Sequence, residues 1–84
     1  MELNDEVERI ESREDLVAFM NSLRSEYGLR PDWWENRDLK SYLEALAGWT
    51  EDMDGYFRNH GLEPPLTPTW RVFGMMLIAA TMYE

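Results

Sequence analysis

Apolar side chains recur at helical spacing after Ser12 and predict a first amphipathic helix over about 13–27. Ser12 is placed to cap this helix, because its hydroxyl can accept a hydrogen bond from a free N–H of the first turn. Gly28 ends the helix and Pro31 prevents its continuation. The apolar stripe is expected to face the core and consists of Leu16, Phe19, Met20, Leu23 and Tyr27.

A second and longer helix is predicted over about 37–60, with Asn36 as its cap and Gly61 at its end. On a helical wheel at about 100° per residue, this stretch divides into three faces. One face carries charges and is interpreted as solvated. The face expected to build the core consists of Leu39, Tyr42, Leu43, Leu46, Trp49, Met53, Tyr56 and Phe57.

Small side chains make up the third face of this helix, which holds Ser41, Ala45, Gly48, Asp52, Gly55 and Asn59. A glycine inside a helix costs about 1 kcal/mol relative to alanine, and close approach of another backbone is the usual compensation. We therefore expect another segment to pack here and to donate a hydrogen bond to Asp52. The expected donors are free N–H groups near Thr67 to Trp70, or the side chain of Arg71.

A third helix is predicted over about 68–83, with Thr67 as its cap and Pro68 at its first position. The run from Val72 to Ala80 contains no charge, and a helix that is apolar on all sides must be covered on all sides. It is therefore the central element of a small bundle or half of a subunit interface. Residues 1–11 fit either a helical face or a short extended segment, and both interpretations stay open.

These elements predict an all-α fold: a compact bundle of three main helices with a short N-terminal segment and a buried C-terminal helix. A length of 84 residues predicts one domain, 1–84, with a modest core. The net charge of −9 argues against direct binding of nucleic acid or of anionic membranes, both of which require Lys and Arg. Without a signal-peptide pattern or an apolar stretch of about 20 residues, we expect a cytoplasmic protein.

Sequence motifs for catalysis or metal binding are not recognisable. The chain contains no cysteine and a single histidine, His60. The stretch around Asp52 and Asp54 superficially resembles a calcium loop, but Thr50 and Gly61 occupy the positions that require an acid and a glutamate. We therefore expect no enzyme activity, no metal and no cofactor. A small ligand-binding domain centred on Asp52 and Tyr56 is a less favoured alternative.

Two adjacent tryptophans, Trp33 and Trp34, lie in the loop between the first two predicted helices. Successive residues in a loop seldom both point inward, so we expect one to fill the core and the other to be exposed. The alternative is that both pack over the ends of the helices. Exposed aromatic side chains are frequent anchors of protein interfaces. Trp49 and Trp70 lie within predicted helices and are expected in the core.

Three motifs resemble a family of small, uncharacterised bacterial proteins. The longest spans Trp34 to Tyr56 and reads W-E-N-x-x-L-x-x-Y-L-E-A-L-A-x-W-x-E-D-M-D-G-Y. It is followed by P-x-x-P-T-W and by a final A-A-x-x-Y-E. The resemblance covers most of the chain and implies a stand-alone bacterial domain, but it implies no activity, cofactor or functional residue.

We interpret the chain as an acidic protein-binding module whose partner is another protein, most plausibly a basic one. An immunity-like or antitoxin-like inhibitor of a basic bacterial protein is the most concrete form, because complementary charge accelerates association. A structural or regulatory homodimer formed through the C-terminal helix is the alternative, and a DNA-mimic inhibitor ranks below it. The candidate partner-binding residues are Trp33, Trp34, Glu51, Asp52, Asp54 and Tyr56.

Overall fold

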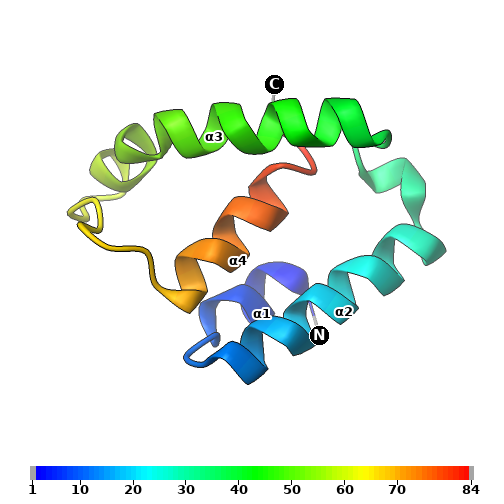
Figure 1. Ribbon diagram of the computed structural model, residues 1–84, viewed down its shortest axis with the longest axis horizontal. Helices are drawn as coiled ribbons and strands as arrows, with labels where there is room; N and C mark the ends of the chain where they lie inside the picture. Colours follow the sequence, from blue (N-terminus) through cyan, green and yellow to red (C-terminus); the bar gives the residue numbers. More distant parts are fainter. Residues whose placement is uncertain (1, 84) are drawn as a thin grey trace.

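The computed structural model describes residues 2–83 and is built from helices (Figure 1). The all-α prediction is confirmed, and no strand occurs among these residues. Residue 1 and residue 84 lie outside the described part of the chain. The helices in chain order are α1 (Leu3–Glu8), α2 (Arg13–Leu29), the 3₁₀ turn η1 (Pro31–Trp33), α3 (Leu39–Asn59) and α4 (Trp70–Ala79).

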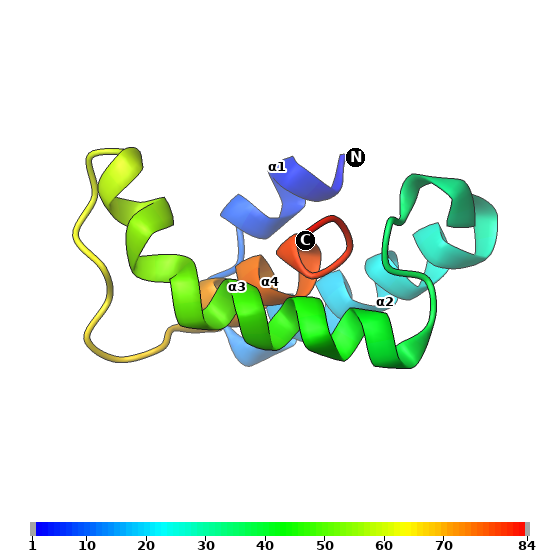
Figure 2. The ribbon, with the colours of Figure 1, turned by 90° about the horizontal axis from the view of Figure 1, so that it is seen from above.

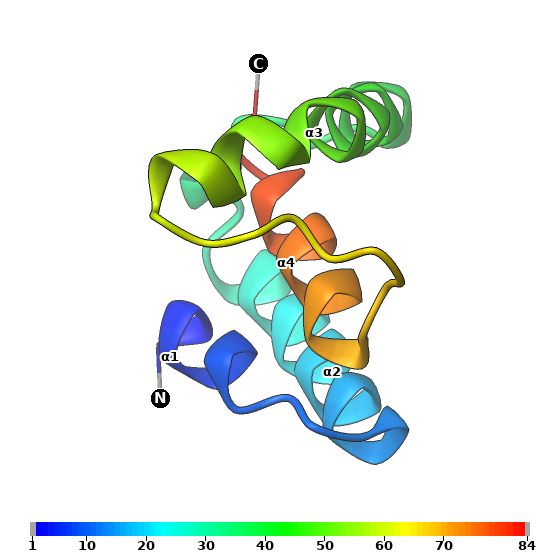
Figure 3. The ribbon, with the colours of Figure 1, turned by 90° about the vertical axis from the view of Figure 1, so that its left-hand side faces the viewer.

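The last helix, α4, lies at the centre of the fold and contacts α1, α2 and α3. Helices α1 and α2 also pack against each other, whereas α3 makes its helix-to-helix contacts in the described region with α4 alone. Figures 2 and 3 show the result, with α4 between α3 on one side and the α1–α2 pair on the other. The prediction that the uncharged run forms the central element of a bundle is therefore confirmed.

The first helix cap is confirmed and the other two predicted caps are wrong by two residues. The hydroxyl of Ser12 accepts from the Asp15 N–H, as expected. Asp38, rather than Asn36, caps α3, and its carboxylate accepts from the N–H and the hydroxyl of Ser41. These two hydrogen bonds lower the pKa of Asp38 below its ordinary value. Residues 3–8, for which helix and extended structure stayed open, form α1.

Asn36 is not available as a cap because its side chain holds the end of the chain. Its Nδ2 donates to the carbonyls of Ala80 and Tyr83, each at 2.9 Å. At the start of α4, Thr69 replaces Thr67 as the cap, and its hydroxyl accepts from the Val72 N–H at 3.1 Å. The helix consequently begins after Pro68 and stops at Ala79, shorter than predicted at both ends.

Gly61 ends α3 as predicted, through a left-handed backbone conformation with φ of 71°. The N–H of Gly61 donates to the carbonyl of Arg58, and the N–H of Leu62 donates to that of Phe57. This pair of hydrogen bonds helps to satisfy the carbonyls at the end of the helix. At the corresponding end of α2, the helix continues one residue beyond Gly28.

The best-buried cluster lies between α1, α2 and α4 and consists of Val7, Ile10, Leu16, Phe19 and Leu23. Leu77 and Ile78 of α4 pack against it, as does Trp34. On α3, Ala45, Trp49 and Phe57 are buried. Ala45 belongs to the small-residue face, so the core-facing side of α3 is rotated toward that face relative to the prediction.

Six side chains that were predicted to be covered are exposed instead. They are Met20, Tyr27, Leu39, Leu43, Trp70 and Phe73, and Leu39 has 72% of its surface accessible. The reason is geometric. Because α2 and α3 each pack against a single flank of α4, only part of each predicted apolar stripe is covered. The remaining part faces outward.

Gly74 allows α4 to cross closely over the α1–α2 pair. A Cβ atom at this position would lie 2.5 Å from Cδ1 of Ile10 and 3.0 Å from Cγ2 of Val7. Gly55 is different, because a Cβ built there meets nothing within 4 Å. The expectation of a closely approaching segment is thus wrong for Gly55. It is right for Gly48, whose Cβ would lie 3.2 Å from the Tyr83 ring.

Alanine at these two glycines should therefore have opposite effects on stability. Gly74→Ala should lower the free energy of unfolding by about 1–2 kcal/mol, since overpacking outweighs the gain in helix propensity. Gly55→Ala should raise it by up to about 1 kcal/mol, because only the propensity term acts. Denaturant titration followed by tryptophan fluorescence measures both. A Gly74→Ala protein as stable as the parent would contradict the close crossing.

Candidate functional site

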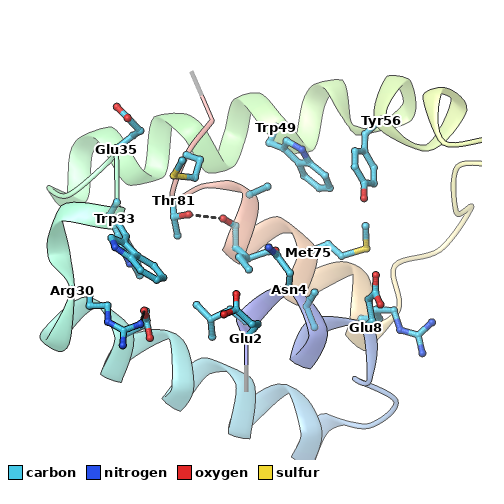
Figure 4. A pocket seen from close by; sticks show the side chains of 18 of the residues that line it. Glu2, Asn4, Glu8, Arg30, Trp33, Glu35, Trp49, Tyr56, Met75 and Thr81 are labelled. Atoms are coloured by element: carbon cyan, nitrogen blue, oxygen red, sulfur yellow. Dashed lines mark hydrogen bonds and ion pairs between the residues drawn. The ribbon is translucent and has the colours of Figure 1, made fainter.

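A groove of about 900 Å³ opens between α1 and α3, on the surface of α4 (Figure 4). Met75, Ile78 and Ala79 of α4 form its floor. Leu3 and Val7 of α1 line one side, and residues of α3 line the other. The groove exists because α1 and α3 each pack on α4 without contacting each other.

Aromatic rings from α3 form the upper side of the groove. Trp49 and Tyr56 project from this helix toward the space above α1 and α4 (Figure 4). Their ring centroids are 5.6 Å apart, and the Tyr56 ring lies 4.3 Å from that of His60. Trp49 has only 8% of its surface exposed, so its neighbours hold it in place. The aromatic side is therefore built before any ligand arrives.

Carboxylates border this apolar interior. Five acidic residues line the groove against two basic ones, Arg30 and Arg71. The acids come from the two ends of α1, from α2, and from η1 and the segment after it, so they border the groove along α1 and at its α2–η1 end, while α3 contributes none. They are Glu2, Glu8, Glu26, Asp32 and Glu35. Such a rim attracts cationic groups and repels anionic ones.

One end of the groove already holds a guanidinium group. The Arg30 Cζ lies 4.8 Å from the centroid of the Trp33 ring, and Nη1 of Arg30 is 3.3 Å from Oε1 of Glu26. Trp33 is 58% exposed, so the indole remains accessible beside this pair. An aromatic face next to a carboxylate is a favourable environment for an arginine side chain.

Trp34 has a structural role as well as a place on the groove. Its ring meets that of Tyr27 edge-on at 5.0 Å and stacks on that of Tyr42 at 5.7 Å. Tyr42 in turn donates from its hydroxyl to the Leu77 carbonyl at 2.8 Å, and burial raises the pKa of this hydroxyl. Trp34 thereby joins α2, α3 and α4 at one end of the molecule. Trp34 is partly buried and Trp33 is 58% exposed, so the two tryptophans differ as expected, and the alternative in which both pack over the ends of the helices is wrong.

Asp52 lies outside the groove and holds the end of the chain. The Tyr83 hydroxyl donates a hydrogen bond to its carboxylate, and the Tyr83 ring covers Gly48. A segment does pack on the small-residue face with a donor for Asp52, as predicted, but the donor is Tyr83 rather than Arg71 or a backbone N–H. The Thr81 carbonyl fixes the same segment by accepting from the N–H groups of Glu35 and Asn36.

The structure brings together three of the six candidate partner-binding residues, because Trp33, Trp34 and Tyr56 all line the groove. Glu51, Asp52 and Asp54 are exposed on α3 and do not line it. Sequence reasoning missed Trp49, which it assigned to the core alone, and the acidic rim. No local pattern marks the rim, since its members lie between positions 2 and 35 and meet only through the fold.

The family model of DUF7660, a family of unknown function, matches residues 12–84. The chain belongs to this family. The expected membership of an uncharacterised family is confirmed, and the match contains α2, α3 and α4 but not α1. No curated protein and no solved structure matches the chain.

Between residues 2 and 83, no three His, Asp or Glu side chains are grouped so that they could hold a metal ion. None of the helices in that range combines the length and the apolar character needed to cross a membrane. The groove is the candidate functional site of the described residues.

The hydrogen bond between Tyr83 and Asp52 should make stability depend on alkaline pH. Donation to the carboxylate, with the nearby charges of Asp52 and Glu51, raises the pKa of Tyr83 above its ordinary value of 10.0. The raised pKa means that this contribution is complete below pH 10.0 and is lost as pH rises through the folded-state pKa. Tyr83→Phe should lower the denaturation midpoint at pH 8, and the deficit should shrink at higher pH.

Parallel denaturation curves between pH 8 and strongly alkaline pH measure this difference, and ionisation of the other tyrosines cancels between the two proteins. In an Asp52→Ala background the effect of Tyr83→Phe should disappear, because the acceptor is already gone. A deficit that stays constant through the titration of Tyr83 would show that the hydrogen bond does not contribute.

Proposed function

We propose that the protein binds a basic, amphipathic segment of another protein in the groove between α1 and α3. The observation that carries this proposal is the combination of an apolar, aromatic interior with a rim of five carboxylates and two guanidiniums. The interior suits apolar side chains, which gain by leaving water. The rim suits lysine and arginine residues along the α1 side of the groove and at its α2–η1 end.

An amphipathic helix matches this distribution of surface. Helices bind grooves by inserting apolar residues at positions i, i+3, i+4 and i+7, while their polar faces stay at the edges. Here Met75 and Ile78 offer the apolar floor and Trp49 offers a rigid aromatic side. A partner with acidic flanks would meet Glu2, Glu8 and their neighbours and would be repelled.

Arg30 supports the choice of a basic partner. Its guanidinium lies over Trp33 and pairs with Glu26 within the groove, so this corner is already complementary to an arginine. Arg30 is exposed, and its pairing with Glu26 is therefore weak enough to exchange. An arginine of the partner can replace it over the same indole ring and beside the same carboxylate.

The most concrete biological form is an immunity-like or antitoxin-like inhibitor in a bacterial cytoplasm. Basic surfaces are typical of nucleic-acid-binding proteins, because they neutralise phosphates. A small acidic domain that covers such a surface would block access of nucleic acid. The net charge of −9 would accelerate the encounter, and the groove would then hold a single segment of the target.

Trp33→Ala should weaken binding of the partner by about 30-fold, the usual effect of removing an aromatic anchor worth ~2 kcal/mol. The protein immobilised on a resin should capture a basic protein from the host lysate and release it at about 1 M salt, where charges are screened. The captured protein should then be titrated against both variants by calorimetry to measure the change in affinity.

Trp70→Ala is the matched control, since it removes an exposed tryptophan from outside the groove and should leave the affinity unchanged. Tryptophan indole N–H signals in NMR spectra provide a second measurement. Those of Trp33 and Trp49 should shift on binding while that of Trp70 should not. Equal affinity for the parent and Trp33→Ala, or capture that is limited to acidic proteins, would overturn the proposal.

A further inference from the structure

Besides Trp33 and Met82, which line the groove, the bundle leaves a second group of large apolar side chains exposed on α2, α3 and α4. Seven exposed residues of α2, α3 and α4 form this apolar face, with 39% to 72% of their surface accessible. They are Val17, Met20, Tyr27, Leu39, Leu43, Trp70 and Phe73. Six of them belong to positions that the sequence predicts to be covered, so their sequence pattern is that of covered residues.

Helical geometry places these residues away from the groove. On α4, Phe73 precedes the groove residue Met75 by two positions, which turns its side chain about 160–200° away. On α3, Leu43 lies about 120° around the axis from Trp49. On α2, Met20 lies about 120° from Glu26, which also lines the groove. Each of the three helices thus has one flank that faces the groove and another that is turned away from it.

The three helices that carry the apolar face are neighbours in the fold. Figure 1 shows α4 between α2 and α3, and α4 contacts both of them. At one end, Tyr27 of α2 and Leu39 of α3 line the same shallow depression of about 260 Å³. At the other end, the rings of Trp70 and Phe73 are 6.3 Å apart.

The area of this face is that of a protein interface. Side chains of this size carry roughly 150–250 Å² each, so seven that are about half exposed offer on the order of 700 Å². The total accessible surface is 6088 Å². A standard interface takes about 800 Å² from each partner, or roughly a tenth of a small protein's surface. Exposed apolar patches on monomers are typically smaller, about 300–600 Å².

We propose that this face is the interface of a symmetric homodimer. None of its seven members is charged, whereas the acidic rim borders the groove. Two chains that each carry −9 can approach only through a surface that keeps their carboxylates apart. An uncharged aromatic and aliphatic patch is typical of interfaces between identical subunits. In this arrangement both grooves stay open, one on each outer side of the dimer.

Light scattering and sedimentation between about 1 and 200 μM should give twice the 10.0 kDa mass of one chain. Leu43→Glu and Met20→Glu should each raise the dissociation constant about 100-fold or more, because symmetry places two new carboxylates in one apolar interface. Both side chains are exposed in the monomer, so the variants should keep their helical circular dichroism. The two residues lie on different helices, so if one variant fails to fold, the other still tests the interface.

Leu66→Glu is the control, since Leu66 is fully exposed in the loop before α4 and lies outside the apolar face. This variant should remain dimeric. Added salt should strengthen the dimer by screening the repulsion between the chains, which is the reverse of its effect on the basic partner. A parent protein that is monomeric at the highest concentration, or a dimer that Leu66→Glu dissociates as readily, would overturn the inference.

Discussion

The fold depends on covering α4, a helix of ten residues whose only charged side chain is that of Arg71. Water solvates such a helix poorly, and each of the other helices contributes part of its cover. Gly74 makes the tightest part of this cover possible, because the missing Cβ lets Ile10 and Val7 approach the α4 backbone. Since α4 contacts all three other helices while α1 and α3 do not contact each other, the spaces between the helices determine both outer faces of the protein.

Those two faces divide the chemistry of the chain. One presents aromatic rings beside a rim of carboxylates, and the other presents seven large uncharged side chains. Salt screens both the attraction to a cationic partner and the repulsion between two acidic chains. The two faces therefore respond to salt in opposite ways, because screening weakens the first association and strengthens the second. The C-terminal segment lies on neither face. Thr81 and Tyr83 fasten it to Asn36 and Asp52, and so they support the position of α3 from the side that α4 does not reach.

The helices were predictable from local signals in the sequence. Where local signals allowed two equivalent choices, tertiary contacts decided between them. Gly61 can adopt a left-handed turn in almost any context, so the end of α3 was predictable. Asn36 and Asp38 are equally good caps by residue type. Asn36 does not cap α3 because its side chain donates to the carbonyls of Ala80 and Tyr83 instead. Periodicity identified the apolar stripes correctly, but it did not show which of their residues the other helices cover. The groove was not predictable, because its sides come from residues that are far apart in the sequence.

The position of α4 in the chain also has a consequence for biosynthesis. The ribosome releases α3 before it releases α4, the one described helix that α3 contacts, and until then Trp49 and Phe57 lack that partner. Phe19 is different, because the α1–α2 cluster around it can form before α4 is made. The nascent chain therefore exposes the apolar side of α3 until α4 has been made, and such transiently exposed apolar surface is prone to aggregation.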